Sequence, residues 1–294
     1  MNQNFKSGYI GIIGRPNVGK STLMNALVGQ KIAIISAKPQ TTRGKILSIA
    51  TDQDSQMIFL DTPGFHKPRT KLGESMVRAV NETIGDVDML LMVAEPVEEI
   101  REAEREMVQK IGAIPAILII NKVDTVKKEA LLPVLAAYSR LHSFLDIIPV
   151  SARTGDGLEQ LKGLIKQHLP QGPMYYPEDM VTDQQEKQVV AEIIREKLLR
   201  LLNQEVPHGT AIEVVKMKEL SDRDEISANI YCEKASHKGI IIGAGGKTLK
   251  QVGTLARVDC ERLLGKKVYL ELWVKVKPGW RNSESAMREI GLEH

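Results

Sequence analysis

A segment near the N-terminus has the residue types and spacing of a phosphate-binding loop. Residues 14–21 read Gly-Arg-Pro-Asn-Val-Gly-Lys-Ser, the pattern GxxxxGKS, and directly follow an apolar run at 9–13. In such loops the glycines let backbone N–H groups curl around a polyphosphate. The lysine reaches the β- and γ-phosphates, and the serine hydroxyl binds Mg²⁺. A short buried strand before the loop and a helix after it are the context that the motif requires. The predicted phosphate contacts are Gly14, Asn17, Val18, Gly19, Lys20, Ser21 and Thr22.

A second motif, farther along the chain, can select the base. The apolar run 117–120 ends in the sequence NKVD, which closes at Asp124. A carboxylate only accepts hydrogen bonds, and guanine offers its N1–H and 2-amino group side by side, so Asp124 can accept both. Adenine would leave the carboxylate unpaired, which is a strong rejection. Asn121 would brace the loop and the stem of Lys122 would cover the base. The motif therefore predicts guanine specificity.

Two more strand ends complete the predicted site. Residues 57–60 run into the sequence DTPG, which ends at Gly64. Asp61 is placed to hold Mg²⁺ through a water molecule. The backbone N–H of Gly64 can approach the γ-phosphate closely, because glycine has no side chain. The last apolar run, at 147–150, is followed by three residues whose backbone can contact the guanine edge: Ser151, Ala152 and Arg153.

These motifs, GRPNVGKS, QTTR at 40–43, DTPG, NKVD and SAR, occur in this order over residues 8–169 and resemble the translation-factor-class GTPases. The resemblance implies an α/β P-loop GTPase domain, a mostly parallel sheet with helices on both faces. It also implies that the threonine before the arginine, Thr42, ligates Mg²⁺ only when GTP is bound, with Thr41 as the neighbouring alternative. The implied metal ligands are Ser21, Thr42 and, through water, Asp61. The implied catalytic residues are Lys20, Thr42, Gly64 and Asn17.

One position departs from Ras-like GTPases, in which a glutamine after DxxG orients the attacking water. Here that position is Phe65, which neither donates nor accepts a hydrogen bond, and His66 follows. We therefore expect slow intrinsic hydrolysis, with another group or a partner placing the water. Some GTPases with a hydrophobic residue there use a P-loop asparagine to hold K⁺, and Asn17 matches that asparagine. Asn17 equally fits a turn residue that tolerates an unusual backbone angle, so both roles stay open.

Length and composition bound the class of protein. The chain has 294 residues, which predicts two domains, and its hydrophobic fraction of 43% suits a globular protein. No apolar run approaches the ~18–20 residues of a membrane span, and the first residues lack the apolar core of a signal peptide. Cys232 and Cys260 are the only cysteines, which favours a reducing cytoplasm over a disulfide framework or a zinc site. Residues 292–294 look like the start of an expression tag.

Positive charge gathers in the C-terminal part of the chain. The net charge of the whole chain is only +3, and residues 1–183 hold 21 basic and 21 acidic side chains. Residues 234–281 contain 11 lysines and arginines against three acidic residues. Such a surplus over a short stretch predicts a polyanionic partner, and a solvated charged face is the simpler alternative.

The second half of the chain reads as a separate α+β domain. Residues 170–183 carry three prolines and no helical or strand period, so we interpret them as a linker. A helical apolar stripe follows over 184–203, with Asp183 as its expected N-terminal cap. Strands are expected at 211–215, 226–231 and 268–274, and a helix is expected from Lys247 to Leu264.

The order helix, two strands, helix, GxxG loop, helix and strand resembles a type II KH domain. In KH domains the GxxG loop clamps the backbone of about four single-stranded nucleotides. Glycines bring the chain close to phosphates, and the N-terminus of the following helix offers N–H donors. We expect Ile241, Ile242 and Leu249 to floor a groove for bases. The predicted RNA contacts are Gly243, Ala244, Gly245, Gly246, Lys247, Lys250, Ile241 and Ile242.

The complete arrangement is a GTPase domain (1–169), a linker (170–183) and a KH domain (184–291), and it resembles the Era family of bacterial ribosome-assembly GTPases. The resemblance implies GTP or GDP and Mg²⁺ as cofactors, with K⁺ as the open addition. It also implies binding near the 3′ end of the small-subunit ribosomal RNA and a role in assembly of the small subunit. We expect a cytoplasmic monomer, and the basic surface leaves peripheral contact with the inner face of a membrane open.

Other function classes fit the sequence less well. A tRNA-modifying GTPase would carry a C-terminal cysteine motif, but both cysteines are internal. Tandem ribosomal GTPases have two P-loops, and this chain has one. A membrane-transport GTPase would need membrane spans. An RNA-binding module with a vestigial GTPase domain is disfavoured by the intact motifs, and a turnover measurement decides it.

Overall fold

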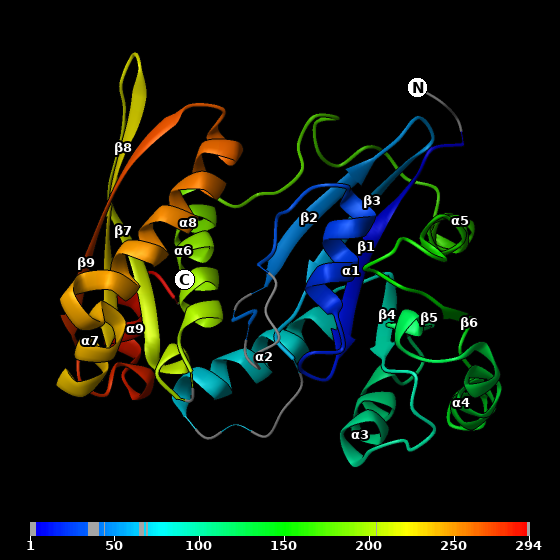
Figure 1. The fold of residues 1–294 in the computed structure, drawn as a ribbon. Helices are drawn as coiled ribbons and strands as arrows, with labels where there is room; N and C mark the ends of the chain where they lie inside the picture. The colour runs from blue at the N-terminus through cyan, green and yellow to red at the C-terminus, as the bar shows by residue number, and fades with distance from the viewer. Residues whose placement is uncertain are drawn as a thin grey trace. The chain divides into compact units, whose positions relative to one another are not determined.

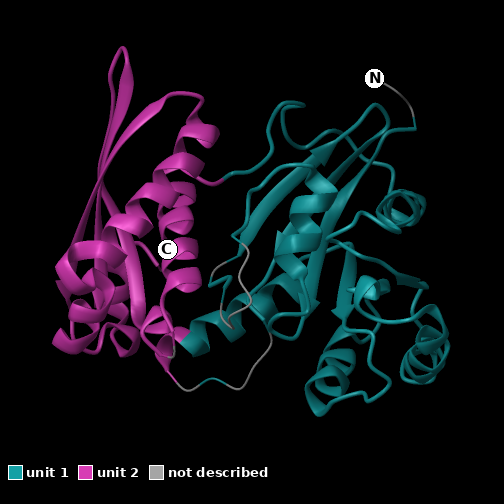
Figure 2. Cartoon of the chain, viewed as in Figure 1, with its two compact units in different colours: residues 1–68, 73–183 teal, residues 69–72, 184–294 magenta. Residues whose placement is uncertain are grey.

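The chain divides into two units, each with its own sheet (Figures 1 and 2). The first comprises residues 1–68 and 73–183, and the second comprises 69–72 and 184–294. The computed structural model describes residues 4–34, 41–43, 45–64, 68, 70–203 and 205–292. Gln40, Phe65 and His66, which the sequence analysis singled out, lie outside these described residues.

The first unit is built on a six-stranded sheet in the order β2-β3-β1-β4-β5-β6 (Figure 1). Only β2 runs antiparallel, against β3, and the other neighbours pair in parallel. The mostly parallel sheet predicted from the sequence is confirmed. Three strands, β3, β4 and β5, are buried along their whole length, as expected for strands covered on both faces. The strands are β1 (Lys6–Gly14), β2 (Ile46–Thr51), β3 (Ser55–Asp61), β4 (Met89–Ala94), β5 (Ala116–Ile120) and β6 (Asp146–Pro149).

Helices cover both faces of this sheet. Alternate residues of β1 point to opposite faces, so Ile12 lies in one core and Ile13 in the other. The first core includes side chains of α1 (Lys20–Val28) and α5 (Leu158–His168). The second includes side chains of α2, α3 and α4. The bounds of these three helices are Lys71–Gly85, Glu102–Ile111 and Leu131–Ser139.

Residues 170–183 cluster with the first unit rather than standing apart as a spacer. The buried side chain of Gln56 holds their backbone: its Oε1 accepts from the N–H groups of Tyr175 and Tyr176 at 2.8 and 3.0 Å, and its Nε2 donates to the Tyr176 carbonyl at 2.9 Å. Further along, Val181 accepts a backbone hydrogen bond from Ile49 of β2 at 2.9 Å. Most of the predicted linker is therefore an edge extension of the GTPase sheet.

The second unit has the fold of a KH domain of the α-first type. Its sheet has the order β7-β8-β9, with β7 antiparallel and β9 parallel to β8. Side chains of α6, α7 and α8 pack on it to form one core. The elements are α6 (Glu186–Leu201), β7 (Thr210–Glu219), β8 (Arg223–Cys232), α7 (Ala235–Ile242), α8 (Lys247–Leu264), β9 (Lys267–Val276) and α9 (Glu284–Glu289). The short 3₁₀ turns of the chain are η1 (Val123–Thr125), η2 (Lys128–Ala130), η3 (Pro207–Gly209), η4 (Ala244–Gly246) and η5 (Trp280–Asn282).

The start of α6 differs from the expectation. The N-terminal cap is Gln185, not Asp183, and Oε1 of Gln188 accepts from the Gln185 backbone N–H at 3.1 Å. Asp183 is wrong as the cap because the helix begins at Glu186, beyond the reach of a side chain three positions earlier. Cys232 and Cys260 are both free and buried in the KH core. Among the described residues, no helix is both long enough and apolar enough to cross a membrane.

Candidate nucleotide and RNA sites

The phosphate loop lies at the carboxyl end of β1, where β3 and β4 flank it on either side. In parallel α/β sheets this strand edge is the usual place for a ligand. Gly19 has φ +101°, and a Cβ there would lie 2.3 Å from Nδ2 of Asn121, so the close approach of the two loops requires glycine. Asn17 also has a positive φ, 66°, which matches the turn role considered for it. Thr22 lies half-buried in the first turn of α1.

Lys20 points back into the loop. Its Nζ donates to the carbonyls of Gly14 and Arg15, both at 3.1 Å, and the residue is 6% exposed. Burial lowers the pKa of Lys20 to about 8, although the charge of Asp61 acts in the opposite direction. The ammonium is thus held by two backbone carbonyls of the loop, and an oxyanion can replace them as its partner.

Three oxygen-bearing side chains meet beside Lys20. Ser21 Oγ donates to Oδ2 of Asp61 at 2.7 Å, and Thr42 Oγ1 lies 3.2 Å from the same oxygen. The two hydroxyls are 3.0 Å apart. Thr42, and not Thr41, is therefore the threonine that reaches this cluster. Among the residues that the structure describes, the other carboxylate oxygen of Asp61, Oδ1, is buried without a hydrogen-bond partner, and burial raises the pKa of Asp61.

Gly64 approaches the phosphate loop from β3. A Cβ at this position would lie 2.7 Å from Cα of Pro16 and 2.8 Å from its nitrogen, so any side chain would force the two loops apart. Thr62, two residues earlier, donates its hydroxyl to the carbonyl of Ile12 at 2.8 Å. These contacts fix the end of β3 against β1, and they bring the Gly64 backbone to the phosphate loop.

Asn121 connects three loops through hydrogen bonds of its side chain. Its Nδ2 donates to the Val18 carbonyl of the phosphate loop at 2.9 Å, and its Oδ1 accepts from the backbone N–H of Ala152 at 3.0 Å. The side chain is buried, so both bonds are shielded from water. The bracing role expected for Asn121 thus has a concrete geometry.

Asp124 presents its carboxylate beside the loop that follows β6. Oδ1 accepts from the Ser151 hydroxyl at 2.6 Å, and Oδ2 pairs with Nη2 of Arg153 at 2.5 Å. The hydrogen bond from Ser151 lowers the pKa of Asp124, burial opposes this effect, and the charge of Arg153 adds to it. Ser151 is buried, whereas the Arg153 side chain is 74% exposed. The pair holds an ionised acceptor where two N–H donors of a base can bind.

The sequence analysis missed three charged residues that join these loops, which are Arg15, Glu95 and Glu104. Lys122, in a left-handed conformation with φ 64°, donates its Nζ to the Asn17 carbonyl and to Oε1 of Glu95, both at 2.6 Å. Arg15 lies 3.2 Å from the other oxygen of Glu95 and 3.0 Å from Glu104 of α3. A carboxylate directly after the buried strand β4 was the available signal for Glu95.

The GxxG segment forms a sharp turn between α7 and α8. Gly243, Gly245 and Gly246 all have positive φ, at 73°, 58° and 77°. At Gly243 a Cβ would lie 2.2 Å from Oγ1 of Thr248 and 3.0 Å from its backbone nitrogen, so glycine is required there. Ala244, Gly245, Lys247 and Lys250 are exposed, so the turn and its two lysines are accessible to a ligand.

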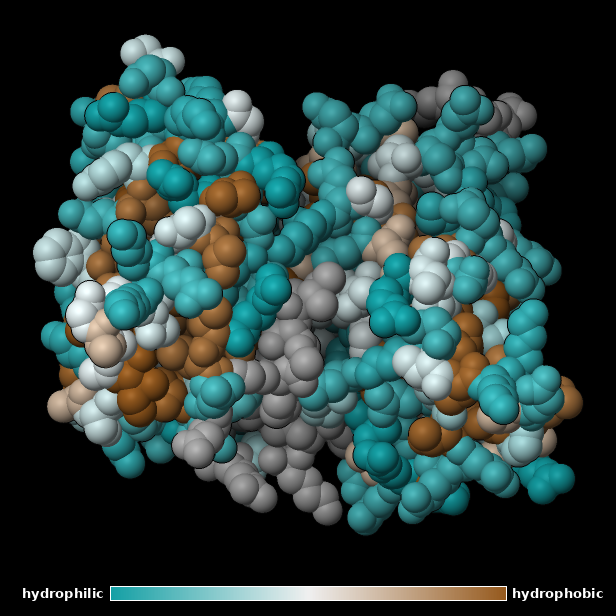
Figure 3. All heavy atoms as spheres, viewed as in Figure 1, coloured by the Kyte–Doolittle hydropathy of each residue, from teal (hydrophilic) through white to brown (hydrophobic). Residues whose placement is uncertain are grey.

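The predicted apolar floor of this site needs correction. Ile241 is fully buried in the KH core, so the prediction that it contacts bases is wrong. Successive residues of a helix point about 100° apart, and α7 turns Ile241 inward and its neighbour Ile240 outward, 50% exposed. Ile242 and Leu249 are half-buried against the core. Figure 3 shows apolar side chains, in brown, gathered over α7 and α8, and Leu255 and Val258 of α8 are also exposed.

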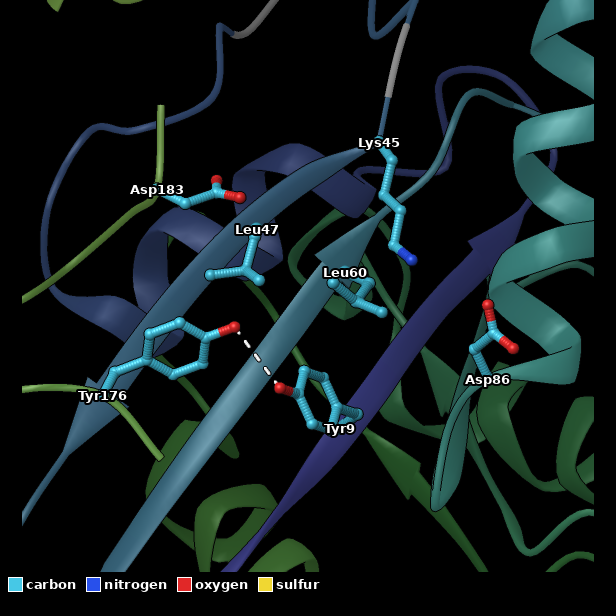
Figure 4. Close-up of a pocket in the computed structure, with 7 residues that line it drawn as sticks. All are labelled: Tyr9, Lys45, Leu47, Leu60, Asp86, Tyr176 and Asp183. Atoms are coloured by element: carbon cyan, nitrogen blue, oxygen red, sulfur yellow. Dashed lines mark hydrogen bonds between the residues drawn. The ribbon is translucent and has the colours of Figure 1, made fainter. Parts of the chain in front are cut away.

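A separate hollow of about 480 Å³ lies on the first unit, away from the phosphate loop (Figure 4). Tyr9 of β1 and Tyr176 face each other across it with their hydroxyls 3.3 Å apart, and this hydrogen bond, with burial, raises the pKa of Tyr9 to about 12. Burial raises the pKa of Asp183 on the same wall. The hollow therefore lies where residues 170–183 pack on the sheet. Its lining residues are Tyr9, Lys45, Leu47, Leu60, Asp86, Tyr176 and Asp183.

The fold and the two sites define a P-loop GTPase joined to a KH domain. Residues 9–122 match the family described as 50S ribosome-binding GTPase, and residues 205–281 match the KH domain family. GTPase Era of Alkaliphilus oremlandii is 52% identical over 98% of this chain and 99% of its own length, and that of Clostridium acetobutylicum is 48% identical over 98% of both. The chain belongs to the Era family, and it is a GTPase that converts GTP to GDP and phosphate.

Solved structures of the family superpose on the whole chain. Era in complex with MgGDPNP and nucleotides 1506–1542 of 16S ribosomal RNA is 38% identical, with a TM-score of 0.95 over 99% of this chain and 100% of that one. A variant of Aquifex aeolicus Era bound to GDP and aluminium fluoride has the same identity, TM-score and coverage. The P-loop GTPase fold and the KH fold predicted from the sequence are both confirmed.

Proposed function

We propose that this GTPase binds single-stranded ribosomal RNA near the 3′ end of the small-subunit RNA and assists assembly of the small subunit. The observation that carries this proposal is the exposed GxxG turn with Lys247 and Lys250 at the N-terminus of α8, in a chain of the Era family. Backbone N–H groups at a helix N-terminus and two lysines suit a phosphate backbone. The relative solved with nucleotides 1506–1542 of 16S ribosomal RNA supports the same RNA as the partner.

In the first unit, each motif has a distinct role toward the nucleotide. Lys20 and the phosphate-loop N–H groups bind the β- and γ-phosphates, and the Gly64 N–H binds the γ-phosphate. Asp124 accepts from N1–H and the 2-amino group of guanine. Lys122 covers the base, and Asn121 holds the loops in register. The backbone of residues 151–153 contacts the guanine edge.

The side-chain cluster beside Lys20 fits Mg²⁺. Two hydroxyls and one carboxylate are oxygen donors, which Mg²⁺ prefers, and it usually keeps several waters. Asp61 Oδ1, buried with no hydrogen-bond partner in the described part of the chain, is the acceptor that a metal-bound water would satisfy. Ser21 and Thr42 would ligate the ion directly and Asp61 through water. When bound, Mg²⁺ neutralises charge that develops on the β- and γ-phosphate oxygens.

Asn17 is our candidate ligand for a K⁺ ion. Its side chain is exposed on the phosphate loop, and Lys122 binds its carbonyl, not its side chain. A monovalent cation there would stabilise charge in the transition state, in the place of an arginine finger. The single-turnover rate at saturating GTP should be higher in K⁺ than in Na⁺ at equal ionic strength. Asn17→Ala should remove the difference, and equal rates for the unchanged protein would exclude a K⁺ role.

RNA binding is tested by Ala244→Asp. Ala244 is exposed between the glycines, and a carboxylate there repels phosphates. Affinity for a single-stranded oligonucleotide of the 16S 3′ end should fall at least about tenfold, as expected for a like charge at a phosphate contact. Ala244→Ser is the matched control and should bind normally. GDP affinity should stay unchanged in both variants. Undiminished RNA binding by Ala244→Asp at moderate salt would remove the GxxG turn from the RNA site.

The proposed work on ribosomal RNA places the protein in the cytoplasm. We propose that it acts as a monomer, because each unit closes its own core. Peripheral membrane contact would depend on the lysines of the second unit, and such contact is lost at high salt. Co-sedimentation with anionic vesicles, with and without RNA as competitor, tests it; absence from the vesicle pellet would exclude it.

A further inference from the structure

Glu95 connects the phosphate loop to the base-binding loop. It follows β4 in the chain, and β4 lies between β1 and β5 in the sheet. The phosphate loop follows β1 and the NKVD segment follows β5, so a side chain after β4 stands between them. Both carboxylate oxygens of Glu95 form ion pairs there: Oε1 lies 2.6 Å from Nζ of Lys122, and Oε2 lies 3.2 Å from Nη2 of Arg15.

The contacts close into a ring. Lys122 Nζ donates to the Asn17 carbonyl as well, and Asn17 is two residues from Arg15 in the same loop. Arg15 is anchored on its other side by Glu104, which is fully buried in α3. The Arg15 carbonyl accepts from Lys20 Nζ at 3.1 Å. A displacement of Glu95 would therefore release Lys122 at the base and Arg15 within the phosphate loop, while Lys20 keeps its second contact, with the Gly14 carbonyl.

The electrostatics agree with a fixed ion-pair network. Burial alone would raise the pKa of Glu95, but the hydrogen bond from Lys122 and the charges of Lys122 and Arg15 hold that pKa below its usual value. Glu95 and Arg15 have side chains 28% and 11% exposed, so water screens the pairs only in part. Networks of this kind are worth more than single exposed pairs.

We propose that Glu95 is a positioning residue that sets nucleotide affinity by fixing Lys122 over the base and Arg15 within the phosphate loop. The inference rests on the nucleotide roles proposed above. The described contacts of the Glu95 carboxylate are with Lys122 and Arg15. Its effect passes through the two cations, and Lys20, Thr42 and Asp61 keep their own contacts.

A positioning role and a purely electrostatic role of Glu95 predict opposite changes in nucleotide affinity. A carboxylate near a polyphosphate repels it, so loss of the charge alone would tighten binding. Loss of the contacts that close the ring would weaken nucleotide binding, because Lys122 and Arg15 would have to be ordered on binding. Glu95→Gln removes the charge, whereas Glu95→Asp keeps the charge and shortens the reach. Under positioning, both variants bind more weakly.

The experiment measures GDP and non-hydrolysable GTP-analogue affinities of the full chain, together with single-turnover hydrolysis at saturating GTP. We expect affinity for both nucleotides to fall about tenfold in Glu95→Gln and Glu95→Asp, the size typical of a lost hydrogen bond between charged groups. The single-turnover rate should stay within about twofold, because only binding is affected. Glu98→Gln, an exposed glutamate of the same loop, is the matched control and should match the unchanged protein.

A double-mutant cycle with Lys122→Met tests whether Glu95 acts on nucleotide affinity through Lys122. In that background Glu95→Gln should lose less affinity than in the unchanged protein, because the contact with Lys122 is already absent and only the contact with Arg15 remains to be lost. An equal loss in both backgrounds would overturn the proposal, as would unchanged or tighter binding by Glu95→Gln. A lowered rate with unchanged affinity would overturn it too. If the unchanged protein fails to bind guanine nucleotides, the proposed nucleotide site falls instead, so the two failures are distinguishable.

Discussion

The nucleotide site and the GxxG turn both suit phosphates, but by different means. In the nucleotide site the decisive groups are buried side chains in a closed set of contacts: Lys20 is 6% exposed and Asp61 is fully buried. In the GxxG turn the decisive feature is backbone shape, set by three glycines of positive φ, and its lysines are exposed. The first site reads a defined small molecule, whereas the second can follow a flexible polymer.

The difference has an electrostatic consequence. Exposed lysines act through water and are screened by salt, whereas buried groups are screened much less. RNA affinity should therefore respond steeply to salt, because bound lysines displace counterions. Nucleotide affinity should depend on the identity of single side chains. The predictions below test this contrast, from the largest expected effect to the smallest.

The largest effect is expected at Asp124. In Asp124→Asn the amide offers one acceptor and one donor, which suits the N1–H and 2-oxo group of xanthine and not guanine. A site built to hydrogen-bond one partner rejects the wrong one by roughly 10⁴-fold, so the ratio of GTP to XTP affinity should reverse by at least about a thousandfold. Competition of both nucleotides for the variant measures the ratio.

The matched control for this substitution is Asp156→Asn, an exposed aspartate of the loop after β6. It should leave the GTP to XTP ratio unchanged. Unchanged GTP preference in Asp124→Asn would remove Asp124 from the base site, and RNA binding without nucleotide should be the same in all three proteins.

The second prediction concerns the backbone of the GxxG turn. In Gly243→Ala a Cβ would clash with Thr248, so the turn must change shape, and RNA affinity should fall at least about tenfold, since a left-handed backbone position and a close contact are both lost. Gly253→Ala lies in α8, where a Cβ would only touch Leu272 at 3.6 Å, and is the control. Normal RNA binding by Gly243→Ala would contradict a site made of backbone.

These contrasts show what sequence patterns can and cannot predict. Lys20, Ser21 and Asp124 were predictable because their motifs follow buried strands that end at one sheet edge. Glu95 was not, because its role depends on β4 lying between β1 and β5, which is a matter of strand order. The sequence pattern did not show which of the three adjacent isoleucines at 240–242 is buried, and the structure shows that it is Ile241.

Residues 170–183 show another limit of pattern reading. Three prolines and the absence of a period indicated a linker, yet Gln56 holds their backbone as a further strand would. A side-chain amide can replace a strand neighbour, since it carries both a donor and an acceptor. Sequence periodicity does not register such side-chain-to-backbone bonds, so the segment's attachment to β2 and β3 became visible only in the structure.

The third prediction is a pH dependence at Asp124. Because the Ser151 hydrogen bond lowers the pKa of Asp124, its carboxylate stays ionised at a lower pH than an ordinary aspartate does, and the ratio of GDP to IDP affinity should be constant from about pH 7 to 4. IDP lacks the 2-amino group and shares the phosphates, so the ratio reports the base contact. In Ser151→Ala the pKa rises toward that of an ordinary aspartate, so the ratio should fall between about pH 5 and 3, by up to about tenfold and at higher pH than in the unchanged protein.

Ser143→Ala, an exposed serine before β6, is the control for this series and should keep a constant ratio. A ratio that falls with acid above about pH 4 in the unchanged protein would contradict the lowered pKa. A constant ratio in Ser151→Ala would show that the Ser151 hydroxyl does not support the Asp124 carboxylate.

The smallest effect is expected where the two sites communicate. Thr42 stands four residues before β2, and the end of β2 that follows it carries the segment leading to α6: Thr182 donates its hydroxyl to the Leu47 carbonyl at 2.7 Å. Only residues 183–185 separate this contact from α6. A γ-phosphate that orders Thr42 would therefore bias the start of the KH domain through β2. We expect the GTP-bound protein to bind RNA more tightly than the GDP-bound protein, by roughly 1–3 kcal/mol.

Thr182→Val tests this route, because it removes the hydroxyl and keeps the shape. The ratio of RNA affinities with a non-hydrolysable GTP analogue and with GDP should shrink about two- to tenfold, the value of one neutral hydrogen bond. RNA affinity of the GDP form should hardly change, since the GxxG turn is untouched. Linkage requires RNA to shift nucleotide affinity by the same factor, which gives an independent measurement of the same coupling. Equal RNA affinities with GTP analogue, GDP and no nucleotide in the unchanged protein would mean that the nucleotide site and the GxxG turn bind their ligands independently. The segment between them would then transmit no coupling.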